Sequence, residues 1–392
     1  MSADRSLAVR PAYGSRSLAE IVPSILAALG VPGAVASIDL PAARRACLVV
    51  VDGLGWPLLK RHREHAQFLA AHLDGALPAT TVFPSSTAVS LTSLMTGAPP
   101  GRHGITGYTM RVPPLDGVMS CLTWSTYGGL SGGHDLRPRF PPEQVQPIEP
   151  LFALAEAGGV MASAVTPAEF AGSGLSIAAY RGARLVPFGP ATDDDVQVAA
   201  IVQALVADRS FAYTYRAEPD ATGHARGVAS AEWRAALRRT DRLVEQIARA
   251  LPPSTLLVVT SDHGMIDVAP GGWTDVAREP ALAQDVLAIG GDPRARHVYA
   301  EDGAADEVVE RWRVGLGDAA VVLSRAEVVD GGLMGESVTP AAAERIGDVV
   351  AVPAPGRAIV DGRIAAWEAD LIGHHGGLTA DEGLVPLLSW LT

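Results

Sequence analysis

Cysteine is scarce in this 392-residue sequence, which contains only Cys47 and Cys121. Two cysteines form at most one bridge, so the chain is not a disulfide-stabilised scaffold. Cys47 lies in an apolar run, and we expect it to be a buried thiol. Aromatic residues are also few, but hydrophobic residues make up 48% of the chain and charged residues 19%, which excludes a disordered chain.

Long apolar runs are absent as well. No uncharged stretch reaches the roughly 18 residues of a transmembrane helix, so we expect no membrane partner. The N-terminus lacks the apolar stretch that follows a basic start in a signal peptide. The sequence therefore predicts a cytoplasmic protein.

Positive charge is in deficit, with 31 Lys and Arg against 43 Asp and Glu. Nucleic-acid binding requires clustered basic residues, so stable binding to a polyanion is not expected. The chain can still bind a small anion where bound metal ions supply local positive charge. The sequence does not indicate an oligomeric state.

Short apolar runs alternate with amphipathic helical patterns along the chain. This alternation predicts an α/β fold, with a doubly wound, mostly parallel sheet flanked by helices. The segment that follows the strand predicted at 210–215 is expected to be a loop through His224. Strands are predicted at 46–51, 160–165, 210–215, 255–260 and 349–352, and helices at 17–29, 88–95, 193–206 and 229–251.

The pattern of apolar and polar residues changes between residues 270 and 345. Short apolar runs at 297–300 and 320–323 flank one amphipathic segment at 305–316. We interpret residues 270–345 as a smaller inserted α+β cap. Residues 1–269 and 346–392 then form the α/β core, with 349–352 as its last strand.

Acidic and histidine residues follow the predicted strands. Asp52 ends the first run, Asp220 and His224 lie four residues apart, and Asp262 and His263 follow the run at 255–260. Each alone is compatible with a helix cap or a surface turn. The carboxyl ends of parallel strands meet at one edge of a sheet, so together these residues predict a metal site. Two further imidazoles, His374 and His375, lie in a glycine-rich loop.

A cluster of hydroxyl residues precedes the helix predicted at 88–95. Thr87 opens this helix, so its hydroxyl and the first backbone N–H groups would face an anion. Metal contact lowers the pKa of a hydroxyl and makes it a nucleophile. The alternative interpretation is that Ser85, Ser86 or Thr87 only caps the helix.

These segments together resemble the alkaline phosphatase superfamily, and most closely its type I phosphodiesterase/nucleotide pyrophosphatase branch. The resemblance spans residues 52 to 377, nearly the whole chain. It rests on Asp52-Gly53, Thr87 through Thr96-Gly97, Pro100 to Ile105, Asp220 to His224, Asp262 to Gly264 and His375 to Gly377.

The resemblance implies two divalent metal ions, expected to be zinc. Asp220, His224 and His375 would hold one ion, and Asp52, Asp262 and His263 the other. Thr87 would contact the second ion and become transiently phosphorylated or nucleotidylated. His103 has a matching position, but we expect it to tie down a loop through a hydrogen bond.

The sequence departs from the family pattern in two places. The nucleophilic threonine of the nucleotide pyrophosphatases directly precedes Phe-Pro, a position that Val82 occupies here. The family spacing from Thr96 selects Thr87 instead, with Thr81 and Ser86 as weaker candidates. Tyr108 lies near the position of a family asparagine that contacts phosphate. His375 is preferred over His374 because it directly precedes Gly376-Gly377.

The predicted activity is two-metal hydrolysis of a phosphodiester or phosphoanhydride bond in a small phosphate ester or nucleotide, through Thr87. The alternative within the superfamily is a phosphomonoesterase or phosphonate hydrolase, since the same metal site serves each. A non-catalytic, metal-dependent nucleotide-binding protein is a third hypothesis. It is disfavoured by the presence of Thr87.

Overall fold

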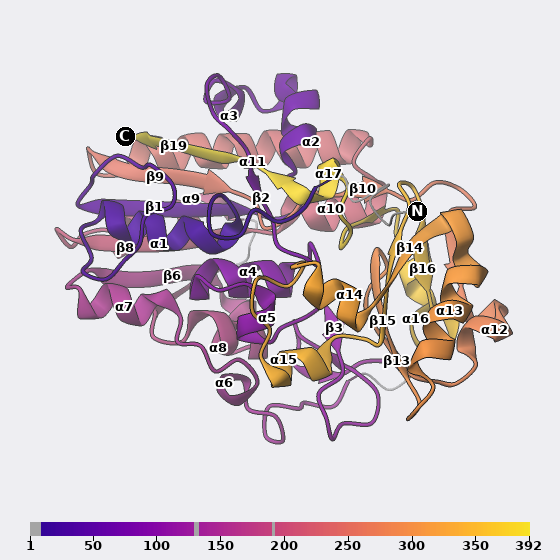
Figure 1. Ribbon diagram of the computed structural model, residues 1–392. Coiled ribbons are helices and arrows are strands. Elements are labelled where there is room, and N and C mark those ends of the chain that lie inside the picture. The colour runs from indigo at the N-terminus through magenta and orange to yellow at the C-terminus, as the bar shows by residue number, and fades with distance from the viewer. Residues whose placement is uncertain (1–8, 129–132, 190–192) are drawn as a thin grey trace.

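A six-stranded sheet forms the centre of the computed structural model, which describes residues 9–128, 133–189 and 193–392 (Figure 1). The strand order is β19-β9-β1-β8-β6-β7. Only β19 runs antiparallel to its neighbour, so the predicted, mostly parallel sheet is confirmed. The strands are β1 (Arg45–Val51), β6 (Met161–Pro167), β7 (Arg184–Phe188), β8 (Ser210–Arg216), β9 (Thr255–Thr260) and β19 (Leu387–Leu391).

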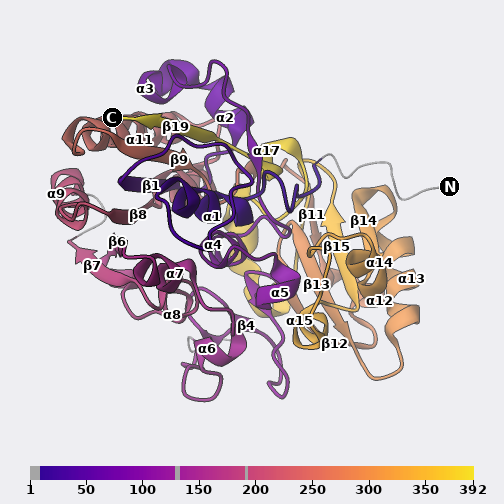
Figure 2. The same ribbon diagram turned by 60° about the vertical axis from the view of Figure 1, so that its left-hand side comes forward.

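Helices cover both faces of this sheet, as Figures 1 and 2 show. In β1, Leu48 and Val50 pack into one apolar cluster, whereas Cys47, Val49 and Val51 pack into the other. A strand buried on both sides is therefore apolar along its whole length. One face carries α1 (Leu18–Ala28), α4 (Thr87–Thr96), α7 (Leu151–Ala157) and α8 (Gly174–Tyr180); the other carries α2 (Trp56–Arg61), α3 (Gln67–Ala70), α9 (Asp194–Ala204) and α11 (Ala231–Ala250).

Helix ends follow the capping residues in the sequence. Ser17 and Glu20 form a capping box at the start of α1, and Ser230 caps α11. Gly97 adopts a left-handed conformation (φ 65°) and ends α4. The four long helices predicted from the sequence are thus confirmed. Both cysteines are buried and unbridged.

A second, four-stranded antiparallel sheet packs beside the first (Figure 1). Its strands are β12 (Val286–Asp292), β13 (Ala295–Ala300), β14 (Ala320–Ser324) and β15 (Val349–Pro353), and α13 (Ala305–Leu316) covers one face. The prediction that 349–352 joins the core sheet is wrong, because β15 pairs with β13 and β14. An apolar run reveals burial but not which sheet buries it. The cap boundary at residue 345 stays a prediction.

The remaining helices and strands are short. No helix in the described residues is both long and apolar enough to cross a membrane. The short elements are η2 (Arg63–His65), β2 (Ala79–Thr80), α5 (Pro100–His103), β3 (Thr109–Met110), β4 (Met119–Ser120), β5 (Ser125–Thr126), α6 (Pro142–Val145), η3 (Ala168–Phe170), α10 (Glu218–Arg226), β10 (Ile266–Asp267), β11 (Trp273–Asp275), η4 (Val276–Arg278), α12 (Pro280–Ala283), η5 (Gly317–Ala319), α14 (Arg325–Asp330), α15 (Pro340–Arg345), β16 (Ala358–Val360), α16 (Gly362–Ala365), η6 (Ala366–Asp370), β17 (Gly373–His374), α17 (Ala380–Gly383) and β18 (Leu384–Val385).

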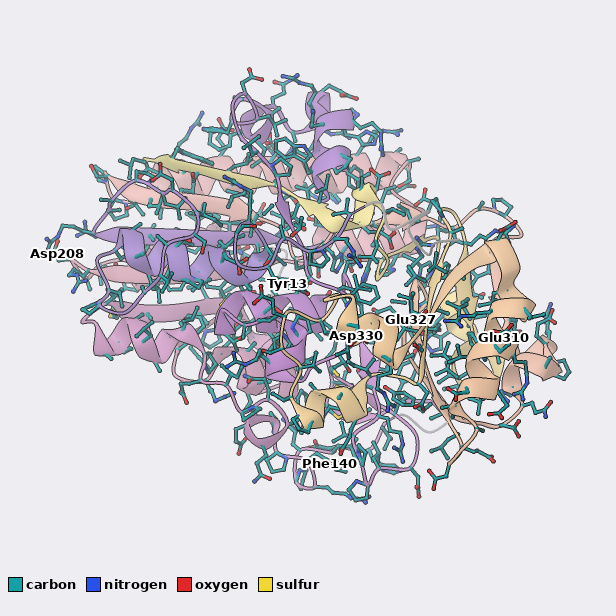
Figure 3. The ribbon with its side chains drawn as sticks, in the orientation of Figure 1. Tyr13, Phe140, Asp208, Glu310, Glu327 and Asp330 are labelled. Carbon is teal, nitrogen blue, oxygen red and sulfur yellow. The ribbon has the colours of Figure 1, made fainter. Side chains whose placement is uncertain are left out.

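Polar contacts join the two sheets at their boundary. Arg294, in the hairpin between β12 and β13, forms a fully buried, bidentate ion pair with Glu382 of α17, at 2.8 and 3.1 Å. Tyr13, labelled in Figure 3, packs against the core of the first sheet and donates a hydrogen bond to the carbonyl of Leu333. Its hydroxyl also accepts from the Phe83 N–H. The second sheet is therefore fastened to the first by specific polar contacts, of which the Arg294–Glu382 pair is fully buried.

Replacing Arg294 with methionine should lower the free energy of unfolding by about 3–5 kcal/mol, because it leaves the Glu382 carboxylate buried without its partner. Urea unfolding followed by circular dichroism measures the change. Arg278→Met is the matched control, since its side chain is 86% exposed and its pair with Asp275 is screened by water. Equal losses of unfolding free energy in both variants would show that the buried pair contributes no more to stability than the exposed one.

Candidate active site

Acidic and imidazole side chains meet at the carboxyl ends of three adjacent strands. Asp52 directly follows β1, and Asp262 and His263 follow β9. The parallel register aligns Val50 of β1 with Thr260 of β9, so the residues after each strand emerge side by side. β8, on the other side of β1, leads into Asp220 and His224.

Asp220 and His224 lie on a helix, α10, and not on the loop predicted from the sequence. Pro219 occupies its first turn, where its missing N–H has no cost. Residues four apart face the same side of a helix. Accordingly, the His224 Nε2 lies 3.4 Å from the Asp220 Oδ2. The helix therefore presents both groups as one unit.

Two overlapping groups of possible metal ligands result. Asp220, His224 and His375 offer ligand atoms that all lie within 4.8 Å of one another. The same holds for Asp52, Asp220 and His263. Asp262 belongs beside the second group, because its Oδ2 lies 3.5 Å from the His263 Nε2. The structure thus brings together all six side chains that the sequence singled out as ligands.

The three imidazoles are oriented by the backbone. The Nδ1 atoms of His224, His263 and His375 each lie 2.7–2.9 Å from a carbonyl oxygen, those of Gly373, Gly264 and Ser85 respectively. An Nδ1–H that donates to a carbonyl leaves the Nε2 lone pair free for a metal ion. Burial, followed by the nearby His263 and His224, also lowers the pKa of His375 well below its usual range. That imidazole is therefore neutral.

The carboxylates direct unsatisfied oxygen atoms into the same space. Asp52 Oδ1, Asp220 Oδ1 and Asp262 Oδ2 are buried and have no hydrogen-bond partner. Burial, together with the charges of Asp220 and Asp262, raises the pKa of Asp52 well above its usual range. Carboxylate oxygens that face one another without hydrogen-bond partners are stabilised by a proton or by a bound cation. Oxygen and nitrogen donors in this number fit divalent metal ions such as zinc.

Gly53 allows the strands to converge this closely. Its φ of 71° is a left-handed conformation, and a Cβ atom there would lie 3.0 Å from the Asp220 Cα. Any side chain at position 53 would displace α10 from the carboxyl end of β1. The glycine after Asp52 is therefore a steric requirement of the site.

Thr87 is the first residue of α4, beside His263. Its Oγ1 lies 3.1 Å from the His263 Nε2. Ser86 is the N-cap residue but makes no side-chain capping bond, so the free N–H groups of the first turn stay available to an anion. Thr81, a weaker candidate, is hydrogen-bonded to Ser90 and to the carbonyl of Asp262. Its hydroxyl is thus already engaged in the core.

His374 points differently from His375. Its Nε2 is buried without a partner, and its ring packs edge-on against Trp273 and His224. His375 joins the ligand group of Asp220 and His224, whereas His374 does not. The geometry favours His375 as the ligand. His103, as expected, is structural, since its ring nitrogens bond to Ser93 and to the Ile105 N–H.

One carboxylate at the site was not predicted. Asp292 ends β12 in the cap, and its Oδ2 accepts a 3.2 Å hydrogen bond from the Tyr108 N–H. Tyr108 was expected near a phosphate-contacting position, and the structure adds Asp292 beside it. Gly290-Gly291-Asp292-Pro293 indicates a hairpin turn, and nothing in that pattern predicts that the turn reaches another sheet.

A cavity of about 880 Å³ opens over these groups. Thr87, Asp52, Asp220, His224 and His375 lie on its wall, together with Asp292. The part away from the ligands is largely apolar and aromatic, as is usual for sites that bind an organic group. Its side chains there include Leu91, Tyr108, Leu122, Phe170, Leu175, Tyr180, Trp367 and Leu371.

Comparison with known proteins places this arrangement among phosphohydrolases. The family model for type I phosphodiesterase/nucleotide pyrophosphatase matches residues 46–378. Murine ectonucleotide pyrophosphatase/phosphodiesterase 5 is similar in fold, with a TM-score of 0.66 and 20% identity over 88% of this chain and 87% of that chain. Phosphonoacetate hydrolase from Sinorhizobium meliloti 1021 gives 0.65 and 20% over 90% and 91%. No curated protein matches the sequence significantly.

Replacing Asp52 with asparagine should stabilise the metal-free protein at pH 8 by about 1–2 kcal/mol, because it removes one of three repelling carboxylates. The asparagine oxygen still accepts the bond that the Tyr215 hydroxyl donates to Asp52. Thermal unfolding after dialysis against a chelator measures the effect. The same variant should lose most of the stabilisation that added zinc gives to the wild type.

The control is Asp318→Asn, which removes an exposed carboxylate in the second sheet's periphery. It should leave both the metal-free stability and the response to zinc unchanged. A metal-free Asp52→Asn protein that is less stable than the wild type would contradict the repulsion described above.

Proposed function

Because this chain belongs to the type I phosphodiesterase/nucleotide pyrophosphatase family of the alkaline phosphatase superfamily, we propose that it hydrolyses phosphodiester or phosphoanhydride bonds through Thr87 as a covalent nucleophile. One observation carries the proposal. The Thr87 hydroxyl lies at the free N-terminus of α4, 3.1 Å from the His263 Nε2 and beside three carboxylates with unsatisfied oxygens. Such a hydroxyl has the surroundings of an activated nucleophile.

Two zinc ions are the proposed cofactors. Asp220, His224 and His375 would hold one, and Asp52, Asp262 and His263 the other. Bound there, the ions supply positive charge that favours the threonine alkoxide and the charge developing on the phosphoryl and leaving-group oxygens. Imidazole nitrogen and carboxylate oxygen are donors that zinc accepts, and manganese or iron would compete for them.

The protein's own groups set up the displacement. Thr87 must transfer its proton to water, and the N–H groups of the first turn of α4 favour the resulting oxyanion. Its Oγ then forms a bond to phosphorus while the bond from phosphorus to the leaving alkoxide or phosphate breaks, and the leaving group takes up a proton from water. In a second displacement, water attacks the phosphorus of the threonine phosphodiester, the bond from phosphorus to the Thr87 Oγ breaks, and the regained proton restores the hydroxyl and releases the product. The phosphoryl group thus changes partner twice.

The cavity supports a substrate with an organic substituent. Its wall beyond the ligand groups is mostly apolar and aromatic, which suits a nucleoside or another hydrophobic alcohol. An inactive form of the similar murine ectonucleotide pyrophosphatase/phosphodiesterase 5 is known in complex with AMP. A nucleotide or a comparable small diester is therefore the proposed substrate class.

The other hypotheses have less support. Phosphonate hydrolysis, the activity of the similar Sinorhizobium meliloti enzyme, shares the proposed metal ligands, but no contact within the described cavity favours it over diester hydrolysis. Phosphomonoester hydrolysis has no more support than phosphonate hydrolysis, since it would also use the proposed metal ligands and no contact within the described cavity favours it. Non-catalytic nucleotide binding leaves the position of Thr87 without a purpose. The cytoplasmic location and the absence of stable nucleic-acid binding stay predictions.

Replacing Thr87 with alanine should reduce hydrolysis of bis-p-nitrophenyl phosphate at least about 10³-fold, because no other free hydroxyl occupies its position. Zinc content, measured by mass spectrometry of the purified protein, should stay unchanged. Thr92→Ala is the matched control on the same helix, since the Thr92 hydroxyl donates to the helix carbonyl of Ala88. Full activity in Thr87→Ala would exclude Thr87 as the nucleophile.

A further inference from the structure

The Asp292 carboxylate lies at the phosphoryl end of the cavity, although it comes from the second sheet. It is 2% exposed, accepts a hydrogen bond from the Tyr108 N–H, and is hydrogen-bonded by the Ser86 hydroxyl. Ser86 directly precedes Thr87 at the start of α4. An anion held by the first turn of this helix would therefore lie beside a carboxylate.

The hairpin that carries Asp292 is fixed in place. Arg294, two residues on, forms the buried pair with Glu382 and donates to the carbonyls of Pro353 and Ala354. Gly376, next to the proposed ligand His375, has a φ of 121°, and a Cβ atom there would lie 2.7 Å from the Asp292 Cβ. The backbone is thus tightly packed around Asp292, which cannot move aside for a substrate without disturbing the core.

Among the described residues, no ion pair joins Asp292 to an arginine, lysine or histidine side chain, although Arg296 and His263 act on it electrostatically. Burial raises the pKa of Asp292 to about 6, so the group is a carboxylate at pH 8. No arginine or lysine of the described chain is found to hydrogen-bond to it. Arg296, the cation that acts on it most strongly, is paired with the buried Glu368. Arg137, on the cavity wall, is paired with Asp135.

We propose that Asp292 selects substrates by the charge of the phosphoryl group, admitting singly charged diesters and rejecting doubly charged monoesters. The inference rests on the proposed function of the site. A diester carries one negative charge at pH 8, whereas a monoester carries nearly two. The second charge would face the Asp292 carboxylate in a buried setting, where repulsion between like charges is strong. Asp292 is thus a specificity-determining residue and does not take part in bond making.

The test compares wild type with Asp292→Asn, which keeps an oxygen acceptor for the Tyr108 N–H and removes the charge. Hydrolysis of bis-p-nitrophenyl phosphate and p-nitrophenyl phosphate is measured at pH 8 with zinc. The ratio of kcat/KM for monoester to that for diester should rise at least about tenfold in the variant, as expected for removing one buried like charge. Asp302→Asn, an exposed carboxylate in the turn after β13, is the control and should leave the ratio unchanged.

A binding measurement separates this inference from the proposed function. Calorimetry with the zinc-loaded protein compares inorganic phosphate, largely a dianion at pH 8, with dimethyl phosphate, a monoanion. Asp292→Asn should bind inorganic phosphate about tenfold more tightly and dimethyl phosphate within about threefold of wild type.

Four results would bear on the inference. A wild type that hydrolyses neither ester sinks the proposed function, but the binding comparison still decides the role of Asp292. Equal changes for both anions, or an unchanged kcat/KM ratio in an active variant, would overturn charge selection. Reduced thermal stability with an unchanged ratio would show that Asp292 only holds Tyr108 and Ser86 in place.

Discussion

Mutual repulsion among Asp52, Asp220 and Asp262 is the constraint around which the rest of the site is arranged. Three carboxylates with unpaired, buried oxygens would separate if they were free to do so. They are held because Asp52 and Asp262 are continuations of adjacent central strands, and because α10 is seated against Gly53. Strands buried on both faces supply the rigidity. A cation bound between these carboxylates would relieve their repulsion, which supports the proposed metal site.

Backbone carbonyls complete the arrangement by fixing the imidazoles. Each proposed histidine ligand has its Nδ1 against a backbone carbonyl, that of the next residue for His263 and that of a distant segment for His224 and His375, and these contacts orient the rings. The second sheet adds a further layer, since the Arg294–Glu382 pair fastens the β12–β13 hairpin next to the loop that holds His375. Glu382 also accepts a hydrogen bond from the Gly377 N–H in that loop. The proposed metal ligands, the second sheet and Thr87 are therefore parts of one packed unit.

The sequence predicted the core of this site because parallel sheets place residues in a regular way. An apolar run followed by Asp52, or by Asp262 and His263, indicates the carboxyl end of a buried strand, and such ends meet. The spacing of Asp220 and His224 predicted their partnership but not α10, since a segment with Pro219 and Gly223 has weak helix propensity, and tertiary contacts decide its form. The pairing of β15 was missed because apolar runs do not encode their neighbours. Asp292 was missed because its role comes from a contact between distant segments.

Ser85 connects two segments that lie far apart in the sequence and are therefore synthesised at different times. Its backbone pairs with that of Gly376, and its carbonyl oxygen lies 2.9 Å from the His375 Nδ1. Its hydroxyl accepts a hydrogen bond from the Gly376 N–H and donates one to the carbonyl of Gly377. The segment that carries Thr87 is synthesised early, yet its surroundings are complete only when nearly the last residues have emerged. The proposed site is therefore assembled from the two ends of the chain, and a chain that lacks residues 375–377 would lack these contacts to the segment before α4.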